Sequence, residues 1–370
     1  FGQGSNGEYN SGATGSWGPQ ITGQEYKRWD DAMGTMKYYD NLDNYFGTGT
    51  ELQENVTLSQ QYGNTSLYVS GTNLNNKSMT PGAALDRTNL TMRGVTQFGK
   101  DNRWTFDGKV QYIRAKANNR PISGKNDRNS ALGMYTFPTT VDVMEFEDCV
   151  NEAGNMTWWN ASGSNPFWMA LYNQNMDQRD RFLMTASLKY QITDWLSAEI
   201  KGGTDMYTNE TTSKVYAGNP NLNTSYAYGL NRFFENNYSF LFTAQKDHIL
   251  GNWGGAATFG GNLMHTMRSG LSANVSNLVI PDLFSVNKGD SKPNVGETSP
   301  AHKKINSLYG SAQVNYDGWF FLEATLRNDW TSTLSKENRS YMYPSVSASY
   351  GFTDMIEKLG NGLPSWLTFG

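Results

Sequence analysis

The groups best able to do acid–base or metal chemistry are thinly spread along this chain. It has three histidines, His248, His265 and His302, and one cysteine, Cys149. No histidine is near another in the sequence, and neither a Gly-x-Ser-x-Gly elbow nor a His-Glu-x-x-His pattern occurs. A single cysteine excludes an intrachain disulfide and a multi-cysteine zinc site. The sequence therefore predicts no catalytic residues and no enzyme, although a Ser/His/Asp set built from distant segments stays open as an alternative.

One stretch near the N-terminus could offer ligands to a hard cation. Asp40-Asn41-Leu42-Asp43-Asn44 carries carboxylate and amide oxygens, which are the ligands that Ca²⁺ prefers. It lacks the central glycine and the terminal glutamate of a calcium-binding loop. We therefore favour a solvated turn at this place, and the sequence predicts no metal site and no cofactor.

The long segment 117–180 is rich in aromatic rings among amide side chains. Flat aromatic faces beside amides suit a sugar or a peptide, because both ligands present apolar patches ringed by polar groups. The predicted ligand contacts are Trp158, Trp159 and Trp168, which lie with Phe167 and Tyr172 in this segment. The alternative, which we favour, is that these rings pack the loop onto itself or onto a partner, since a loop this long must bury something to stay ordered.

The rest of the chain must hold these residues in place, and its sequence predicts β-strands. From Trp104 to Tyr112 every even position is apolar, aromatic or glycine, and every odd position is polar. Residues 182–190 and 196–200 repeat this alternation, with Leu183 as an exception. Because successive side chains of a strand point to opposite faces, the predicted sheet has one apolar and one polar face.

Connections between the predicted strands alternate between short and long. About eleven strands are expected, near 51–61, 65–73, 87–98, 104–116, 181–190, 196–207, 237–246, 253–265, 307–316, 320–329 and 343–352. The alternation places all long loops on one side, as in outer-membrane barrels with tight periplasmic turns and long outer loops. The sequence therefore predicts an all-β fold, an antiparallel transmembrane β-barrel. Its polar residues Asp107, Lys109, Gln111, Glu199 and Lys201 are expected to line the channel or to hold a plug.

Composition supports this prediction. The formal net charge of −4 argues against a nucleic-acid partner, which requires a basic face. No run approaches the roughly 18 apolar residues of a membrane-spanning helix. Aromatic residues recur beside the short turns, as in the girdles at the two membrane interfaces of a barrel. These are Phe98, Trp104, Tyr190, Trp195, Trp253, Tyr316, Trp319 and Phe352.

Eleven strands do not close a barrel. Single-chain bacterial barrels have an even number of strands, and an open edge in lipid leaves backbone groups unpaired at several kcal/mol each. Both ends of the chain read as cut, since Phe1-Gly2-Gln3-Gly4 has the composition of a loop and residues 366–370 resemble the start of a strand. We therefore expect residues 1–370 to be part of one barrel domain, with the remaining strands outside this sequence. A short helical turn is expected near 353–365.

Two stretches carry a resemblance to a known family. One is Leu326-Arg327-Asn328-Asp329-Trp330-Thr331-Ser332-Thr333-Leu334, followed by Asn338-Arg339-Ser340-Tyr341-Met342-Tyr343-Pro344-Ser345-Val346-Ser347; the other is Ser16-Trp17-Gly18-Pro19. Together they resemble the SusC/RagA family of TonB-dependent outer-membrane transporters from Bacteroidetes. Thr193-Asp194-Trp195-Leu196 and Asn165-Pro166-Phe167-Trp168 are similar to patterns of this family. Met342 departs from the family, where an aromatic residue is more frequent.

The resemblance implies a 22-stranded barrel whose lumen is filled by a plug. It also implies location in the bacterial outer membrane, contact with the TonB complex and a SusD-like surface lipoprotein as a lid. Dimers of transporter–lid pairs would fit the family. The implied function is TonB-dependent uptake of an oligomeric nutrient without cleavage, with a glycan oligosaccharide placed first and a peptide second. The alternative from another class is a passive porin-like or structural barrel. The plug and the TonB-contacting segment have no counterpart in these residues.

Overall fold

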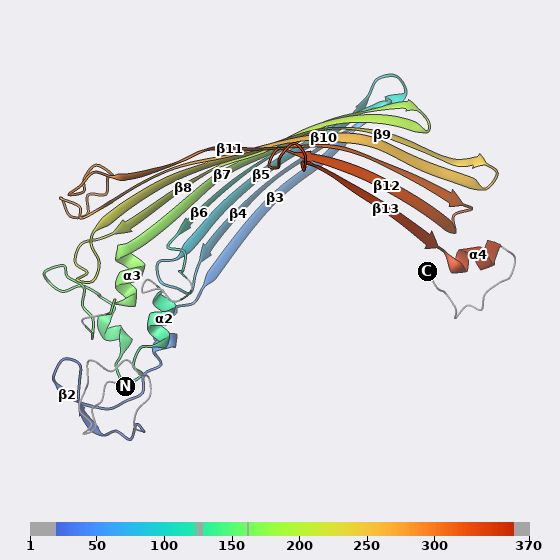
Figure 1. The fold of residues 1–370 in the computed structure, drawn as a ribbon. Coiled ribbons are helices and arrows are strands. Elements are labelled where there is room, and N and C mark those ends of the chain that lie inside the picture. Colours follow the sequence, from blue (N-terminus) through green and yellow to red (C-terminus); the bar gives the residue numbers. More distant parts are fainter. Residues whose placement is uncertain (1–19, 123, 125–128, 161–162, 359–370) are drawn as a thin grey trace.

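A single antiparallel sheet of eleven strands dominates the computed structural model, which describes residues 20–122, 124, 129–160 and 163–358 (Figure 1). Each strand is hydrogen-bonded to its neighbours in the sequence, so the sheet is an uninterrupted up-and-down meander from β3 to β13. The strands are β3 (Thr50–Tyr62), β4 (Thr65–Lys77), β5 (Ala84–Phe98), β6 (Trp104–Asn118), β7 (Asn173–Thr193), β8 (Leu196–Val215), β9 (Ser225–Leu250), β10 (Trp253–Ser276), β11 (Asn294–Tyr316), β12 (Phe320–Thr331) and β13 (Ser340–Tyr350).

The eleven predicted strands are confirmed in number and order, but several are longer than predicted. Strand β7 begins at Asn173 rather than near 181, β9 begins at Ser225 rather than near 237, and β11 begins at Asn294 rather than near 307. All of these extensions lie at the long-loop ends. At the start of β7 the side chains are mostly polar on both faces, so the alternation that marks a half-apolar strand disappears while the backbone ladder continues. The start of β9 instead carries aromatic residues on both faces, such as Phe233 and Phe234, so the alternation is lost there as well.

The two faces of the sheet differ as the alternation predicts. The pairing register places Val110, Met184 and Thr204 on one face, and Lys109, Thr185 and Gly203 on the other. On the apolar face large side chains are exposed within this chain, for example Val56 at 76% and Val346 at 74%. An exposed apolar face of this extent is typical of a sheet that meets lipid.

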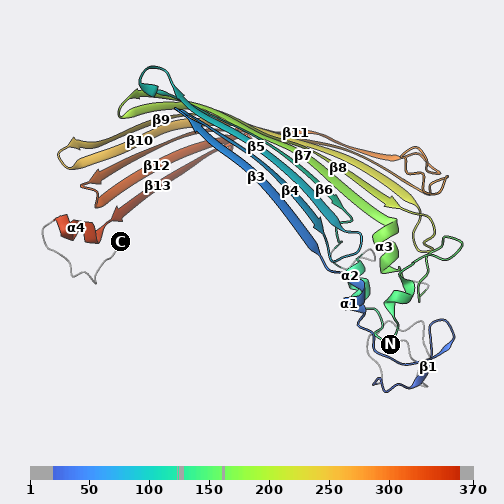
Figure 2. The same cartoon turned by 180° about the vertical axis from the view of Figure 1, so that it is seen from behind.

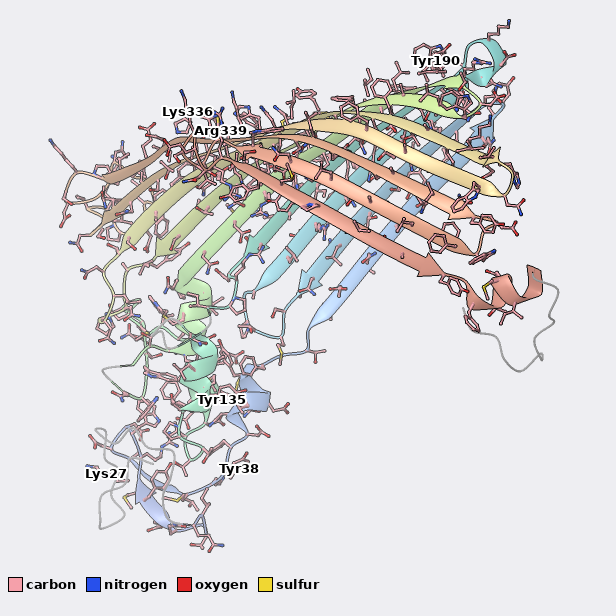
Figure 3. All side chains as sticks on the ribbon, turned by 45° about the vertical axis from the view of Figure 1, so that its right-hand side comes forward. Lys27, Tyr38, Tyr135, Tyr190, Lys336 and Arg339 are labelled. Atoms are coloured by element: carbon pink, nitrogen blue, oxygen red, sulfur yellow. The ribbon has the colours of Figure 1, made fainter. Side chains whose placement is uncertain are left out.

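Aromatic rings meet at the short-turn end of the sheet. Trp104 packs against Tyr190 with ring centroids 4.4 Å apart, and Trp253 packs against Tyr316 at 5.0 Å. Trp319 contacts Tyr350 at 5.4 Å. These contacts join rings on neighbouring strands and in the turn before β12, so they form the belt expected at one membrane interface. Figure 3 labels Tyr190 at this end of the molecule.

A loop subdomain lies beyond the opposite ends of β3, β6 and β7 (Figures 1 and 2). It comprises the described residues of 20–49 and of 119–172. Its elements are β1 (Glu25–Lys27), β2 (Met33–Thr35), α1 (Asn41–Tyr45), α2 (Ser130–Tyr135), η2 (Val143–Phe146) and α3 (Pro166–Tyr172). Two segments separated by four strands of the sheet therefore fold together as one unit.

Two shorter elements complete the fold. A 3-10 turn, η1 (Lys100–Asn102), joins β5 to β6, and helix α4 (Phe352–Lys358) follows β13, in agreement with the helical turn predicted there. None of the helices in the described part of the chain is long and apolar enough to cross a membrane. The stretch Ser16-Trp17-Gly18-Pro19 and the terminal segment 366–370 lie outside the described residues.

Candidate functional site

The loop subdomain has a hydrophobic core of its own. Val143 is fully buried, and Phe146 and Trp168 are each 1% exposed. The core also contains Tyr45, Met134, Phe137, Val141, Cys149, Phe167 and Met169. Because rings from the opening segment and from 129–172 share this core, the long loop is a packed structure beside the mouth of the sheet.

Asn165 ties three backbone segments of this core together. Its side chain is fully buried, and its Nδ2 donates to the carbonyls of Phe146 at 2.8 Å and Thr157 at 2.9 Å. Its Oδ1 accepts a hydrogen bond from the backbone N–H of Phe167 at 2.8 Å, which caps α3. Pro166 stands at the first helical position, where a missing N–H costs nothing. The Asn-Pro-Phe-Trp pattern singled out in the sequence is therefore a capped helix start.

In the stretch 40–44, two of the side chains considered as possible cation ligands in the sequence bind the protein's own backbone. The Asp40 carboxylate accepts from the backbone N–H of Asp43 at 3.2 Å and so caps α1. Asn41 is 5% exposed and donates to the carbonyls of Pro138 and Val141, while its Oδ1 accepts from Val143 N–H. Two of the candidate oxygens, Asp40 Oδ1 and Asn41 Oδ1, thus accept hydrogen bonds from the protein's own backbone.

The predicted ligand residues Trp158, Trp159 and Trp168 all belong to the loop subdomain. Trp158 stacks on Phe137 with ring centroids 5.1 Å apart, and Trp159 meets Phe137 edge-on at 6.0 Å. Trp158 and Trp159 are half-buried at the border of the core, whereas Trp168 is inside it. The first two can present part of a ring to a ligand as the loop stands. Trp168 can do so only if the core opens, and ligand contact by all three residues stays a prediction.

A second series of rings joins Trp168 and Tyr172 to two residues that the sequence analysis missed, Tyr216 and Phe284. Trp168 stacks on Tyr172 with centroids 4.4 Å apart, Tyr172 meets Tyr216 at 5.5 Å, and Tyr216 meets Phe284 at 4.6 Å. Tyr216 lies in the connection after β8 and Phe284 in the connection after β10. These rings link three outer connections. No periodic signal in the sequence indicates Tyr216 and Phe284, because each is an isolated aromatic residue in a connection between strands.

Burial perturbs the titratable groups of this core. Burial raises the pKa of the Cys149 thiol to about 11, with a smaller contribution from the nearby Asp148 carboxylate. Burial also raises the pKa of the Tyr45 hydroxyl, which donates to the carbonyl of Pro166 at 3.3 Å. At neutral pH these groups are protonated and uncharged, so they serve the core as apolar or hydrogen-bonding groups and not as nucleophiles.

The polar face of the sheet carries paired charges. Arg93 on β5 forms two hydrogen bonds with Asp107 on β6, at 2.9 and 2.6 Å, and Arg181 on β7 binds Asp205 on β8 in the same way, at 2.8 and 2.6 Å. Such bidentate pairs fix side-chain direction across neighbouring strands. Lys109, Glu199 and Lys201 make no salt bridge within the described residues.

A hollow of about 540 Å³ lies on the polar face over β3 to β6. Its lining includes Asn89, Arg93, Lys109, Gln111 and the ring of Tyr68. Gln111 donates to the Oδ1 of Asn89 at 2.9 Å, so the floor is held by a side-chain pair. The hollow presents cationic, amide and aromatic groups on the polar face of the sheet. That Lys109 and Gln111 line a channel or hold a plug stays a prediction.

The structure brings together two histidines that are distant in the sequence. His265 on β10 and His302 on β11 lie with Nε2 and Nδ1 3.0 Å apart and ring centroids 5.3 Å apart. Only the strand register could have revealed this pair. No third His, Cys, Asp or Glu completes a metal-binding group with them in the part of the chain that the structure describes.

We compared the chain with protein families, curated sequences and solved structures. No family profile matches the chain, and no curated protein sequence matches it. Among solved structures it is similar to the RagAB peptide transporter, with a TM-score of 0.71, 16% identity, and coverage of 84% of this chain and 35% of that chain. The same importer in its open-open state gives a TM-score of 0.70 and 17% identity, with coverage of 84% and 34%. The ferripyoverdine receptor of Pseudomonas aeruginosa gives 0.50 and 12%, with coverage of 84% and 40%.

The sheet, its girdle and these likenesses show the fold of a β-barrel segment, of the class seen in the RagAB transporter and the ferripyoverdine receptor. Within this class the particular likeness is to the RagAB transporter, so the resemblance to the SusC/RagA barrel is confirmed at the level of fold. The chain spans about a third of the length of the transporter chains it matches. These matches are transporters and receptors rather than enzymes. The fold agrees with the predicted location in the bacterial outer membrane, with long loops outside and short turns in the periplasm.

Proposed function

We propose that residues 1–370 are about half of the barrel domain of a TonB-dependent importer. The observation that carries this proposal is the eleven-stranded meander with one apolar face, one polar face and a packed outer loop subdomain, aligned over 84% of its length with the RagAB transporter. The remaining strands and the plug would come from other parts of the protein. The sheet would supply a rigid wall and a polar lumen for a nutrient that passes without being cleaved.

The proposed substrate is an oligomer, either an oligosaccharide or a peptide. Half-buried Trp158 and Trp159 beside amide side chains support both. The likeness to a peptide transporter supports the peptide, which the sequence had placed second. In either case the outer loops would hold the ligand above the plug before TonB-driven release into the lumen.

A lid lipoprotein of the SusD kind is the proposed partner on the outer face. The loop subdomain presents exposed apolar side chains there, with Met33 at 66%, Tyr38 at 64% and Tyr135 at 69% exposure. Figure 3 labels Tyr38 and Tyr135 on this subdomain. Rings that are solvent-exposed on an otherwise packed loop are the kind of residue that a partner protein buries.

An uptake assay tests the importer against the passive alternative. Cells that contain or lack the protein would be given fluorescent oligopeptides and oligosaccharides, with and without an uncoupler that collapses the proton-motive force. We expect protein-dependent uptake of one substrate class that stops when the force is collapsed. Uptake that continues after uncoupling would indicate a porin-like barrel instead.

Single tryptophan variants test the ligand contacts. Trp158→Ala and Trp159→Ala should lower uptake, while Trp29→Ala serves as the matched control because Trp29 borders the same core. Limited proteolysis of the outer loops would be run on all three variants. If uptake falls equally in all three, or falls only where the loops become protease-sensitive, the two tryptophans act by packing and the ligand role is wrong.

A further inference from the structure

The apolar face of the sheet is hollowed over β6 to β12. The hollow has a volume of about 770 Å³, and its lining includes Gly202, Gly261 and Ala186. Gly261 is necessary to its floor, because a Cβ there would come within 2.7 Å of the Phe240 ring and 3.0 Å of Leu308. The walls are apolar side chains on the same face, including Leu188, Ile200, Tyr238, Leu263 and Leu308.

A cluster of nitrogen-bearing side chains borders this hollow on the same face. In the β10–β11 ladder Leu263 is opposite Asn306, and both line the hollow. The next pair on that face is His265 opposite Lys304, followed by Met267 opposite His302. Lys304 and His302 are exposed, and His265 contacts His302 through the 3.0 Å ring contact. We call His265, His302 and Lys304 the cationic cluster.

The cationic cluster lies at the far membrane interface from the aromatic girdle. His265 is twelve residues beyond Trp253 on β10. That separation corresponds to about 40 Å along a strand, and to about 30 Å along the membrane normal at a strand tilt of about 40°. Since the apolar band of a barrel is about 25 Å tall, the cluster is level with the headgroups of the outer leaflet, directly beyond the hollow.

The charge around the cluster favours an anion. Its two ladder rows on β8 to β11 contain Thr204, Asn236, Met206 and Phe234 in addition to the cluster and Met267, and they carry no carboxylate. Arg232 lies one row further out, opposite Ser269. The described carboxylates on this face near the cluster, Asp180, Glu210 and Glu297, are in that row or beyond it. Asp180 accepts a hydrogen bond from the Tyr112 hydroxyl at 2.5 Å.

We propose that this face holds one anionic phospholipid as a specific ligand. The phosphate-bearing headgroup contacts Lys304 and the ring N–H that the histidine pair leaves free of its mutual hydrogen bond, and an acyl chain lies in the glycine-floored hollow. A lysine ammonium and imidazole donors give charge-assisted hydrogen bonds to phosphate oxygens. An acyl chain in the hollow gains dispersion contacts with the exposed rings and methyl groups of its walls. The ligand is a lipid of the surrounding membrane and is independent of the transported nutrient.

Native mass spectrometry of the purified protein in a neutral detergent tests this proposal. Phosphatidylglycerol and phosphatidylcholine with the same acyl chains would be added in parallel. We expect selective retention of phosphatidylglycerol, and about tenfold weaker retention in the double variant His302→Gln, Lys304→Gln. Lys303→Gln is the matched control, because Lys303 is the next residue on the same strand but lies on the polar face, opposite Thr266. Equal losses in the control and the double variant, or no loss in either, would overturn the proposal.

Two further measurements separate the headgroup from the acyl chain. Gly202→Leu places a side chain in the hollow. A Cβ added at Gly202 would lie 3.6 Å from the Tyr238 ring, which is an ordinary van der Waals contact, so the backbone can accept the substitution. This variant should lose phosphatidylglycerol while the cationic cluster is intact. Inorganic phosphate at the lipid's concentration should leave the bound lipid in place. Displacement by phosphate alone, or normal lipid binding by Gly202→Leu, would exclude an acyl-chain site and so contradict the proposal.

Discussion

Asn165 shows how a single side chain can organise a long loop. It satisfies the carbonyls of two segments and the N–H of a third, all inside the core of the loop subdomain. The sequence marked Asn165-Pro166-Phe167-Trp168 as unusual but could not show why. A buried amide has both donors and acceptors to satisfy, and only the fold shows which backbone groups meet it.

Replacing Asn165 should therefore unfold the loop subdomain and spare the sheet. Asn165→Ala leaves buried backbone groups unpaired, which we expect to cost about 3 kcal/mol. The measurement is limited proteolysis between residues 129 and 172 together with heat-dependent gel mobility of the barrel. Asn44→Ala, at an exposed site of α1, is the control and should behave as the native protein. Equal resistance of both variants would show that the hydrogen bonds of Asn165 add little stability.

The thiol of Cys149 should report the opening of the same core. It is 1% exposed, and burial holds its pKa at about 11, above an ordinary value near 9.0. We expect negligible alkylation at pH 8 in the native state and rapid alkylation once the subdomain is unfolded. Because the folded pKa is the higher one, the thiol's contribution to stability is full below pH 9 and declines as the pH rises towards 11. Rapid alkylation of the native protein at pH 8, measured by mass, would contradict this burial.

At the scale of the strands, the sequence predicted only the segments that cross the membrane, because only there must apolar and polar side chains alternate. Between the girdle and the far interface each strand must alternate, so residues 104–112 and 182–190 marked β6 and β7 from the sequence alone. Beyond the interface the alternation is lost, and the start of β7 at Asn173 was missed. The hollow and the histidine pair were also beyond reach, because both depend on a cross-strand register that no local pattern specifies.

Adjacent positions on β7 provide a direct test of the two faces. Met184 lies on the apolar face, six residues from the girdle residue Tyr190, which places it near the bilayer midplane. Met184→Lys should destabilise the barrel by about 2–4 kcal/mol. Thr185→Lys, on the polar face, should change stability by less than about 0.5 kcal/mol. The free energy of unfolding from urea titration in lipid vesicles compares them, and equal destabilisation would refute the assignment of faces.

At the scale of the whole molecule, the sheet has two open edges, β3 and β13, among the described strands. Unpaired edges of 13 and 11 residues are templates for further pairing, and in lipid they are costly. Residues 1–370 refolded alone into vesicles should therefore form dimers or larger assemblies, visible by cross-linking. A stable monomer that retains all of its strand content by circular dichroism would show that the edges are protected in another way.

The meander also has a consequence for the order in which the molecule folds. Every ladder joins strands that are neighbours in the sequence, so hairpins can form one after another with little loss of chain entropy. The loop subdomain is the opposite case, since Tyr26 bonds to Thr140 across 114 residues, and Asn41 bonds to Val141 across 100. These contacts become inexpensive only after β3 to β6 have paired and brought the two segments to one rim. We therefore expect the loop subdomain to fold late. Once it is folded, the first four strands of the sheet must already be paired in register.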